Sequence, residues 1–323
     1  MLTWRGHLLA YFLAALAMVY LSYRLPGWLP GDFVTAMYAD SHVALGQEQE
    51  AALRERLQQA GAGFGAYLLA LGRLDWGMSY ALRTPVSDLI LEALPWTLLL
   101  MGSAHLLATV LGFIAGVEAA WRRGGRIERA GVGGMTVLQG VPEIGTGVLL
   151  LMVFAYHLGW LPAGSGATLY VEYGFAERVL DVLRHLALPL ATLLLAWFPG
   201  NFLLARASMV LVLGQSFLDT ARAKGLPPMR VRYAHAARNV LLPMATRFGL
   251  RFAFMVTGAL VVETIFSYPG LGTLLFNAIG ARDLPLIQGI VLFSALAVLG
   301  VNLVLEWVYG RLDPRVRVHG RAL

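Results

Sequence analysis

The sequence predicts an all-α integral membrane protein with six transmembrane helices and an extracytoplasmic insertion between the first two of them. The prediction rests on the composition, on the spacing of the apolar windows and on the placement of the arginines. Hydrophobic residues make up 58% of the 323 residues and charged residues only 14%, whereas soluble domains carry about 25% charged residues. A chain of this composition belongs in a bilayer.

Six windows are long and apolar enough to cross the hydrocarbon, which takes about 20 residues of helix. The windows are 7–25, 94–117, 132–158, 186–205, 245–266 and 286–308. The first resembles a signal peptide in length and follows Arg5, but Tyr20–Tyr23 lacks the small-x-small pattern that a processing site needs. We therefore expect a retained first helix and one compact membrane domain.

The basic residues predict the orientation of these helices, because Lys and Arg concentrate in short cytoplasmic loops. The segment 206–247 has six Arg and Lys224 against a single Asp, and the 118–129 loop has four Arg against two Glu. Between the first two windows, residues 24–92 instead carry five Arg against eight acids. Both termini are therefore expected in the cytoplasm. The net charge of +6 indicates topology, not nucleic-acid binding.

The same pattern divides the chain into functional regions. Residues 1–93 hold the first helix and an outer cap, 94–310 the core transmembrane domain with a basic cytoplasmic loop at about 206–244, and 311–323 a basic cytoplasmic tail. Within the cap, short amphipathic helix patterns occur at 47–59 and from Tyr67 to Leu74. The cap either packs on the helix bundle as a solvated layer or contacts a ligand directly.

Prolines and glycines modify the predicted helices. Pro142, Pro189 and Pro199 fall inside apolar windows, where a proline removes a backbone hydrogen bond and bends or breaks the helix. Such breaks are tolerated at membrane depth only where protein or a water-filled cavity surrounds them. They indicate a lined pathway or gate, or else static kinks. The small residues of 112–116 and 131–134 allow two helices to approach closely.

Ionisable residues inside a span tend to face a cavity or a partner, because their insertion costs about 2.5–3.5 kcal/mol. Glu143 follows Pro142 halfway through the third window. It either contacts a cationic part of a substrate, forms a structural ion pair or occupies a water-solvated interior position. His105 and Glu263 also lie within windows. The pathway candidates are Pro142, Glu143, His105 and Glu263.

Several classes of chemistry are disfavoured. Lys224 is the single lysine and stands in no Gly-x-x-x-x-Gly-Lys-Ser/Thr run, so ATP hydrolysis is expected on other subunits. The seven histidines form no metal-ligand pair, and no Gly-x-Ser-x-Gly or cysteine occurs. We expect no catalytic residue, no metal site and no cofactor on this chain.

The most informative segment is a cationic island between apolar windows. It runs Asp219, Thr220, Ala221, Arg222, Ala223, Lys224, Gly225 and Leu226, and Asn239 to Pro243 follows after a basic run. It resembles the cytoplasmic coupling loop, or EAA loop, of the membrane subunits of binding-protein-dependent ABC importers. Its sequence is similar to that of the oligopeptide, dipeptide and nickel permease branch (B-type subunit).

Further segments extend this resemblance over nearly the whole chain. They are Leu29 to Asp32, Leu158 to Gly164, His185 to Pro189, Val262 to Gly272 and Leu312 to Arg317. Within them, Glu263 matches the family pattern, and Tyr268 stands where Trp is commoner. Glu143 departs from the pattern, so its role is not carried over.

The resemblance implies a type I ABC importer permease fold in the bacterial inner membrane and one half of a translocation pathway. The implied partners are a second homologous permease, two ATP-binding subunits that hold ATP and Mg, an extracytoplasmic solute-binding protein and membrane lipid. Nucleic acid is not among them. Peptides are the first substrate class, and nickel chelates or glutathione-like compounds are the next.

The implied coupling residues are Asp219 to Gly225, on a helix at about 216–225 that fits a groove of the ATPase. The small residues Thr220, Ala221, Ala223 and Gly225 allow close packing, and Arg222 and Lys224 reach polar groups. We expect Gly225→Arg to abolish transport and leave membrane insertion intact. The alternative for this loop is contact with anionic lipid. For the chain, the alternatives are a secondary ion-coupled transporter and a membrane scaffold without transport.

Overall fold

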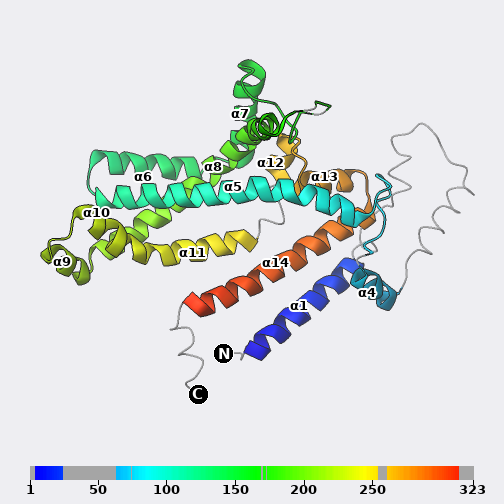
Figure 1. Cartoon of the computed structure of the whole chain (residues 1–323), viewed down its shortest axis with the longest axis horizontal. Coiled ribbons are helices and arrows are strands. Elements are labelled where there is room, and N and C mark those ends of the chain that lie inside the picture. Colours follow the sequence, from blue (N-terminus) through cyan, green and yellow to red (C-terminus); the bar gives the residue numbers. More distant parts are fainter. Residues whose placement is uncertain are drawn as a thin grey trace, which may run out of the picture. The chain divides into compact units, whose positions relative to one another are not determined.

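The computed structural model describes residues 4–24, 63–73, 75–168, 170–171, 173–253 and 260–312. In this part of the chain, all the regular secondary-structure elements are helices. The β-structure is limited to a single isolated bridge between Met78 and Pro85. The chain forms two compact units, one of residues 1–95 with 270–323 and one of residues 96–269 (Figure 1). The expected helix at 47–59 and the motif at 29–32 lie outside the described residues, as does the tail beyond Leu312.

Three helices of the described residues are long and apolar enough to cross a membrane. They are α5 (Val86–Trp121), α8 (Phe175–Leu213) and the Leu284–Glu306 part of α14 (Leu284–Leu312). They cover the predicted second, fourth and sixth windows. The protein is therefore helical with at least these three span candidates, and the count of six stays a prediction.

None of the first, third and fifth windows forms a single helix that is long and apolar enough to count as a span candidate among the described residues. Helix α1 (Trp4–Arg24) covers the first window. The third holds α6 (Arg126–Gln139), α7 (Glu143–Leu150) and the π-helix η2 (Leu151–His157). In the fifth, α11 (Ala237–Ala253) and α12 (Leu260–Ile265) flank residues outside the described part.

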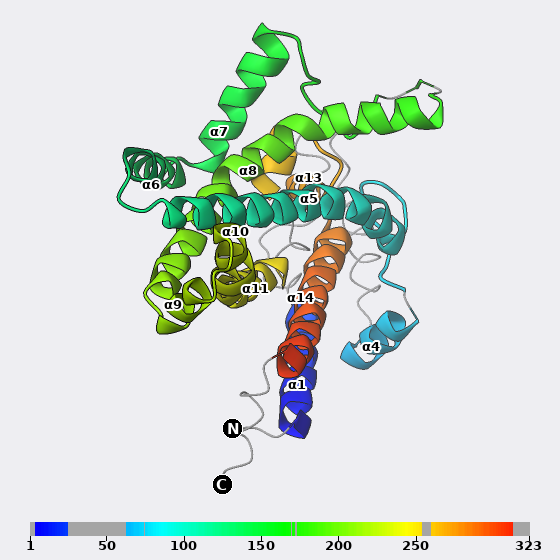
Figure 2. The ribbon, with the colours of Figure 1, turned by 60° about the vertical axis from the view of Figure 1, so that its left-hand side comes forward.

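The third window is a broken helix. The α6 helix and the α7–η2 segment meet at 95°, and together they count as a fourth span candidate. Pro142 is the N-cap of α7, with a ψ of 138°, so the break occurs where the proline predicts it. Figure 2 shows α7 leaving the end of α6 at a steep angle. In contrast, α8 continues through Pro189 and Pro199, so a break at these two prolines is not observed; each removes a single hydrogen bond from a long ladder.

In the 96–269 unit, α5 packs closely on α8 through two glycines. A Cβ at Gly112 would lie 2.6 Å from the Cβ of Asn201, and a Cβ at Gly116 would lie 2.6 Å from the carbonyl oxygen of Phe202. The predicted role of the 112–116 cluster in close helix packing is thus confirmed. Around Gly134, by comparison, a Cβ would meet nothing within 4 Å.

The unit of residues 1–95 and 270–323 has its own packing. Helix α1 packs on α14, and α13 (Leu271–Gly280) packs on α14 as well. The α4 helix (Phe64–Gly72) confirms the short pattern predicted from Tyr67 and contacts α1 through the rings of Tyr20 and Phe64, 5.4 Å apart. Buried Asp283 precedes α14 and accepts a hydrogen bond of 2.5 Å from the Ser79 hydroxyl. This carboxylate holds the loop before α5 in place.

Candidate functional site

The cationic segment forms the short helix α9 (Ser216–Ala223), which Figure 1 shows at one end of the 96–269 unit, near the last turns of α8. Two residues after the end of α9, Gly225 has a φ of +72°, a left-handed conformation that favours glycine. Its N–H donates a 2.9 Å hydrogen bond to the carbonyl of Arg222. Gly225 is thus the structural end of α9.

The two faces of α9 have different surroundings. Leu218 and Ala221, three residues apart on one face, are 0% and 5% exposed and belong to a core that includes Met209 of α8 and Val240 of α11. The other candidate coupling residues are exposed: Asp219, Thr220, Arg222, Ala223, Lys224 and Gly225. One face of α9 therefore fixes the helix to the rest of the unit, and the other is open.

Behind α9, the end of α5 is joined to the π-helix η3 (Val231–Ala236) by charge and aromatic contacts. The guanidinium of Arg232 donates to the carboxylate of Glu118 and lies 4.8 Å from the ring centre of Trp121. The Tyr233 hydroxyl donates to the same carboxylate at 2.8 Å. Burial raises the pKa of Tyr233, and the neighbouring Glu118 raises it further, so the phenol stays a donor at neutral pH.

A second ion pair joins α6 to α8. The Arg206 guanidinium donates to Glu128 from Nε at 2.9 Å and from Nη2 at 2.5 Å. Glu128 is buried and also accepts a hydrogen bond from the Gly124 N–H at 3.3 Å. In the sequence, Glu118 and Glu128 are the two acidic residues of a basic loop. Their position next to the ends of two apolar windows was the one sequence signal of a structural role. The ion pairs themselves could not be predicted, because the arginine partners are far away in sequence.

His105 is buried, as expected for a polar residue inside the second window. Its Nε2 lies 2.9 Å from the carbonyl oxygen of Phe248, and its ring stacks on the Phe248 ring with centres 4.3 Å apart. The Trp197 ring contacts it edge-on at 6.0 Å. His105 thus joins α5 to α8 and α11.

Glu263 is completely buried and accepts a 2.8 Å hydrogen bond from the Thr97 hydroxyl. The adjacent segment supports the loop of residues 159–168, since the Ser165 N–H donates to the Phe266 carbonyl at 3.0 Å. A Cβ at Gly164 would lie 2.6 Å from that same carbonyl oxygen. Two of the segments quoted for the resemblance therefore pack on each other, with Glu263 anchored beneath them.

Glu143 starts α7 directly after the break at Pro142 and is half-buried. On α11, the guanidinium of Arg251 lies 5.5 Å from the Trp197 ring centre. Glu143 forms no ion pair among the described residues. Arg247 lies one turn before Arg251 and belongs to no sequence motif, but its guanidinium packs against Gly200 of α8.

For metals, the described residues contain no group of three or more His, Cys, Asp or Glu side chains placed to hold an ion. The arrangement instead combines long apolar helices, a broken span with polar residues at the break, and a short helix with one anchored and one open face. These features define a membrane transport component.

Comparison with known proteins agrees with this class. The family described as binding-protein-dependent transport system inner membrane component matches residues 108–318. The oligopeptide transport system permease protein AppB of Bacillus subtilis (strain 168) is 35% identical over 305 residues, 93% of this chain and 94% of that protein. The di/tripeptide transport system permease protein DppB of Pseudomonas aeruginosa (strain UCBPP-PA14) is 37% identical over 320 residues, 92% and 93% of the two chains.

A putative peptide transport system permease protein of Brucella abortus (strain 2308) is 35% identical over 310 residues, 94% of each chain. The chain belongs to the family of inner membrane components of binding-protein-dependent transport systems. It is a multi-pass membrane permease subunit of an ABC importer, and a transport subunit rather than an enzyme.

Proposed function

We propose that this chain forms one half of the translocation pathway of an ATP-driven importer of peptides. Relatives that match it over more than nine-tenths of its length are named as permeases for oligopeptides and for di- and tripeptides. Nickel chelates and glutathione-like compounds are the next substrate classes. In this proposal a second homologous permease completes the pathway, and an extracytoplasmic solute-binding protein delivers the substrate.

Two ATP-binding subunits are the proposed motor, and α9 is the proposed contact with them. The observation that carries this assignment is the division of α9 into a buried face of Leu218 and Ala221 and an exposed face. A helix with one face packed on the helix bundle and the other face exposed to a partner can transmit a movement of the partner to the bundle. Thr220, Ala223 and Gly225 are small enough for close packing, and Arg222 and Lys224 reach outward. Ala221 supports the helix from within.

Movement of α9 would reach the membrane helices through the contacts behind it. The Glu118 carboxylate binds Arg232 and Tyr233 and thereby links η3 to the end of α5. Closure of the ATPases would then turn the bundle between inward- and outward-facing states, which is a rigid-body change and not a chemical step. ATP and Mg are held by the partner subunits in this scheme, and no cofactor by this chain.

The proposed membrane arrangement has six spans in a bacterial inner membrane, with both termini in the cytoplasm. Residues 1–93 supply the first span and the outer cap, 94–310 the core, and 311–323 the tail. The chain has no natural cysteine, so single substitutions report the side of the membrane. Ala163→Cys should react with a membrane-impermeant maleimide added outside spheroplasts, and Ala223→Cys should react only after lysis. The opposite pattern refutes the orientation.

Purification of the tagged chain from its native membrane in mild detergent tests the assembly. The importer assignment predicts that a second permease and one or two ATPases with P-loops accompany it. A chain recovered alone or as a homo-oligomer, under conditions that keep a control ABC importer whole, refutes the assignment and favours an ion-coupled secondary transporter.

A further inference from the structure

A polar cluster of the 96–269 unit draws its residues from α5, from the α6–α7 pair, from α8 and from α11. Glu143 and Gln139 flank the 95° break between α6 and α7. Trp197 and Gly200 lie on α8, beside Pro199. Arg247 and Arg251 come from α11 and His105 from α5. Three of these helices, α5, α8 and the α6–α7 pair, are span candidates.

Arg247 lies directly against the backbone of α8. A Cβ at Gly200 would be 2.5 Å from its Nη2 and 3.8 Å from Nε2 of Gln139. The guanidinium therefore occupies the space that a side chain at position 200 would fill. Gly200 lies about five residues before the end of the predicted 186–205 span, or about 7.5 Å along the helix from its cytoplasmic end. By the predicted boundaries of this window, the guanidinium lies within the apolar layer, close to its cytoplasmic edge.

Within the part of the chain that the structure describes, Arg247 has no charge partner. Its Nε is buried without a hydrogen-bond partner among these residues, and none of their ion pairs includes it. Arg251, one turn away, differs because its guanidinium lies 5.5 Å from the centre of the Trp197 ring. Among the described residues, Arg247 thus has neither a carboxylate nor an aromatic ring as a partner.

A buried histidine nitrogen adds to the unused polar groups. The Nδ1 of His105 has no hydrogen-bond partner among the described residues, although Nε2 is bound to Phe248. Buried polar atoms are normally paired, and leaving one unpaired costs about 1 to 3 kcal/mol. Two buried nitrogens of the cluster, Nε of Arg247 and Nδ1 of His105, thus have no hydrogen-bond partner among the described residues.

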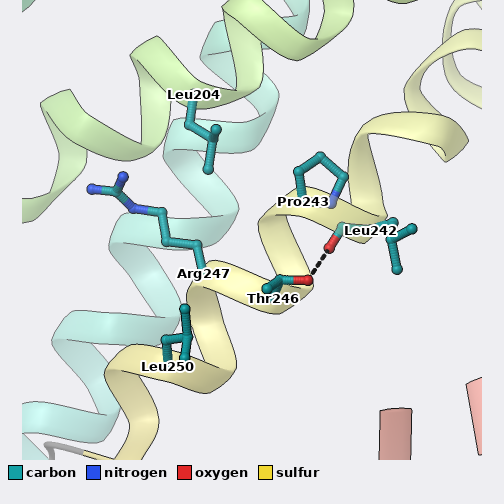
Figure 3. A pocket seen from close by; sticks show the side chains of 6 residues that line it. All are labelled: Leu204, Leu242, Pro243, Thr246, Arg247 and Leu250. Carbon is teal, nitrogen blue, oxygen red and sulfur yellow. Dashed lines mark hydrogen bonds between the residues drawn. The ribbon is translucent and has the colours of Figure 1, made fainter. Parts of the chain in front are cut away.

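Beside Arg247 lies a groove with room for a small molecule. Figure 3 shows Arg247 reaching from α11 toward the neighbouring helices, with Leu204 of α8 on the other side of the groove. The groove is open to the surface and measures about 490 Å³, a volume comparable with that of small-molecule sites. Its lining is otherwise apolar, apart from Thr246, and consists of Leu204, Leu242, Pro243, Thr246, Arg247 and Leu250.

We propose that Arg247 is a substrate-binding residue of the pathway and holds a carboxylate of the transported solute, such as the C-terminal carboxylate of a peptide. This rests on the proposed function. A guanidinium binds a carboxylate through two parallel N–H···O bonds, which a primary amine does not. Intramembrane arginines face a cavity or a partner, and the break at Pro142 needs a water-filled or protein-lined space, which favours a pathway over a lipid-facing site.

The test is uptake into proteoliposomes that contain the purified complex with ATP inside and the binding protein outside. The probes are radiolabelled alanine peptides of two to five residues and the same peptides as C-terminal amides, each at a saturating concentration. Comparing each variant with the unmodified chain for the same probe cancels the preference of the binding protein. We expect Arg247→Gln to lower uptake of the free acids at least about tenfold and of the amides less than about twofold.

Two further variants control for folding and for charge. Arg247→Lys keeps the charge and should retain at least about a third of the free-acid uptake, and exposed Arg123→Gln should leave both probes unchanged. Parallel loss of acids and amides, or no loss, overturns the proposal. Loss of the second permease from the purified Arg247→Gln complex also overturns it, because Arg247 would then pair with that subunit. If the unmodified complex takes up neither probe, the peptide-importer function itself fails.

Discussion

Two regions of the 96–269 unit have arginines in the interior, and the two regions differ in whether these arginines form ion pairs. At the end near α9, Arg206 binds Glu128 and Arg232 binds Glu118, so each arginine that is drawn inside meets a carboxylate. Around Pro142 and Gly200, Arg247 packs against α8 and has no carboxylate partner among the described residues. The first arrangement makes a rigid support, whereas the second leaves binding capacity for something else.

The difference indicates what each region contacts. The α9 end satisfies its interior and leaves an outer helix face open, which suits a large partner that covers a surface. The cluster at Arg247 leaves an interior charge open, which suits a small anion that enters. Paired charges therefore mark the parts that transmit movement, and the unpaired charge marks the part that meets the solute.

The largest effect is expected from Ala223→Arg, on the open face of α9. An unpaired charge in a packed interface costs about 3 to 5 kcal/mol, enough for at least about a hundredfold loss of coupling. Uptake in proteoliposomes should fall to background while the purified variant keeps its melting temperature. Ala223 is preferable to Gly225, since any side chain at φ +72° also strains the backbone.

Ile127→Arg is the control for this prediction, because Ile127 is 80% exposed on another helix of the same unit. It should leave uptake within about twofold of the unmodified chain, since a surface change away from a contact has little energetic effect. Full uptake by Ala223→Arg, or equal losses in both variants, contradicts the docking role of α9.

A smaller effect is expected at the α5–α8 contact, on which both regions depend. Gly116→Ala places a methyl group 2.6 Å from the Phe202 carbonyl oxygen, and such overpacking costs about 1 to 3 kcal/mol. The melting temperature in detergent should fall by about 2 to 4 °C per kcal/mol. Gly134→Ala meets nothing within 4 Å and should change it by no more than a degree or two. Equal melting temperatures for the two variants refute the close helix contact.

The smallest expected effect is the difference in stability between a variant that breaks a partly buried ion pair and one that breaks an exposed ion pair. Arg232→Met removes a hydrogen-bonded partner of Glu118 and should destabilise the chain by about 1 to 2 kcal/mol. Arg222→Met removes a pair with Asp219 whose side chains are 50% and 75% exposed, and should cost less than about 0.5 kcal/mol. Thermal unfolding in detergent measures both. A larger loss for Arg222→Met contradicts the view that the support lies behind α9.

Local patterns predicted a large part of this structure. Apolar windows located α5, α8 and α14, Pro142 located the bend in the third window, and Gly112 and Gly116 located a close helix contact. Each of these follows from neighbouring residues along the chain. The uninterrupted course of α8 did not, because a long helix with packed neighbours tolerates a proline that would break a short one.

The site was predicted in part. The sequence placed a helix at the cationic segment, but the burial of Leu218 and Ala221 depends on α5, α8 and α11 converging behind it. Arg247 gave no sequence signal beyond being an arginine near the start of a window. Its contact with Gly200 and the pairing of Arg206 with Glu128 link residues from different helices, and such contacts emerge only when the helices are packed.

The most direct test of the account uses a single thiol on the open face of α9. Ala223→Cys, in a chain with no other cysteine, is coupled to a thiol-reactive photo-crosslinker in native membranes and irradiated. The account predicts a covalent product that contains an ATP-binding subunit, and none from Ala163→Cys treated in the same way. No such product from Ala223→Cys, with the complex otherwise intact, would contradict the role of α9 as the link to the motor.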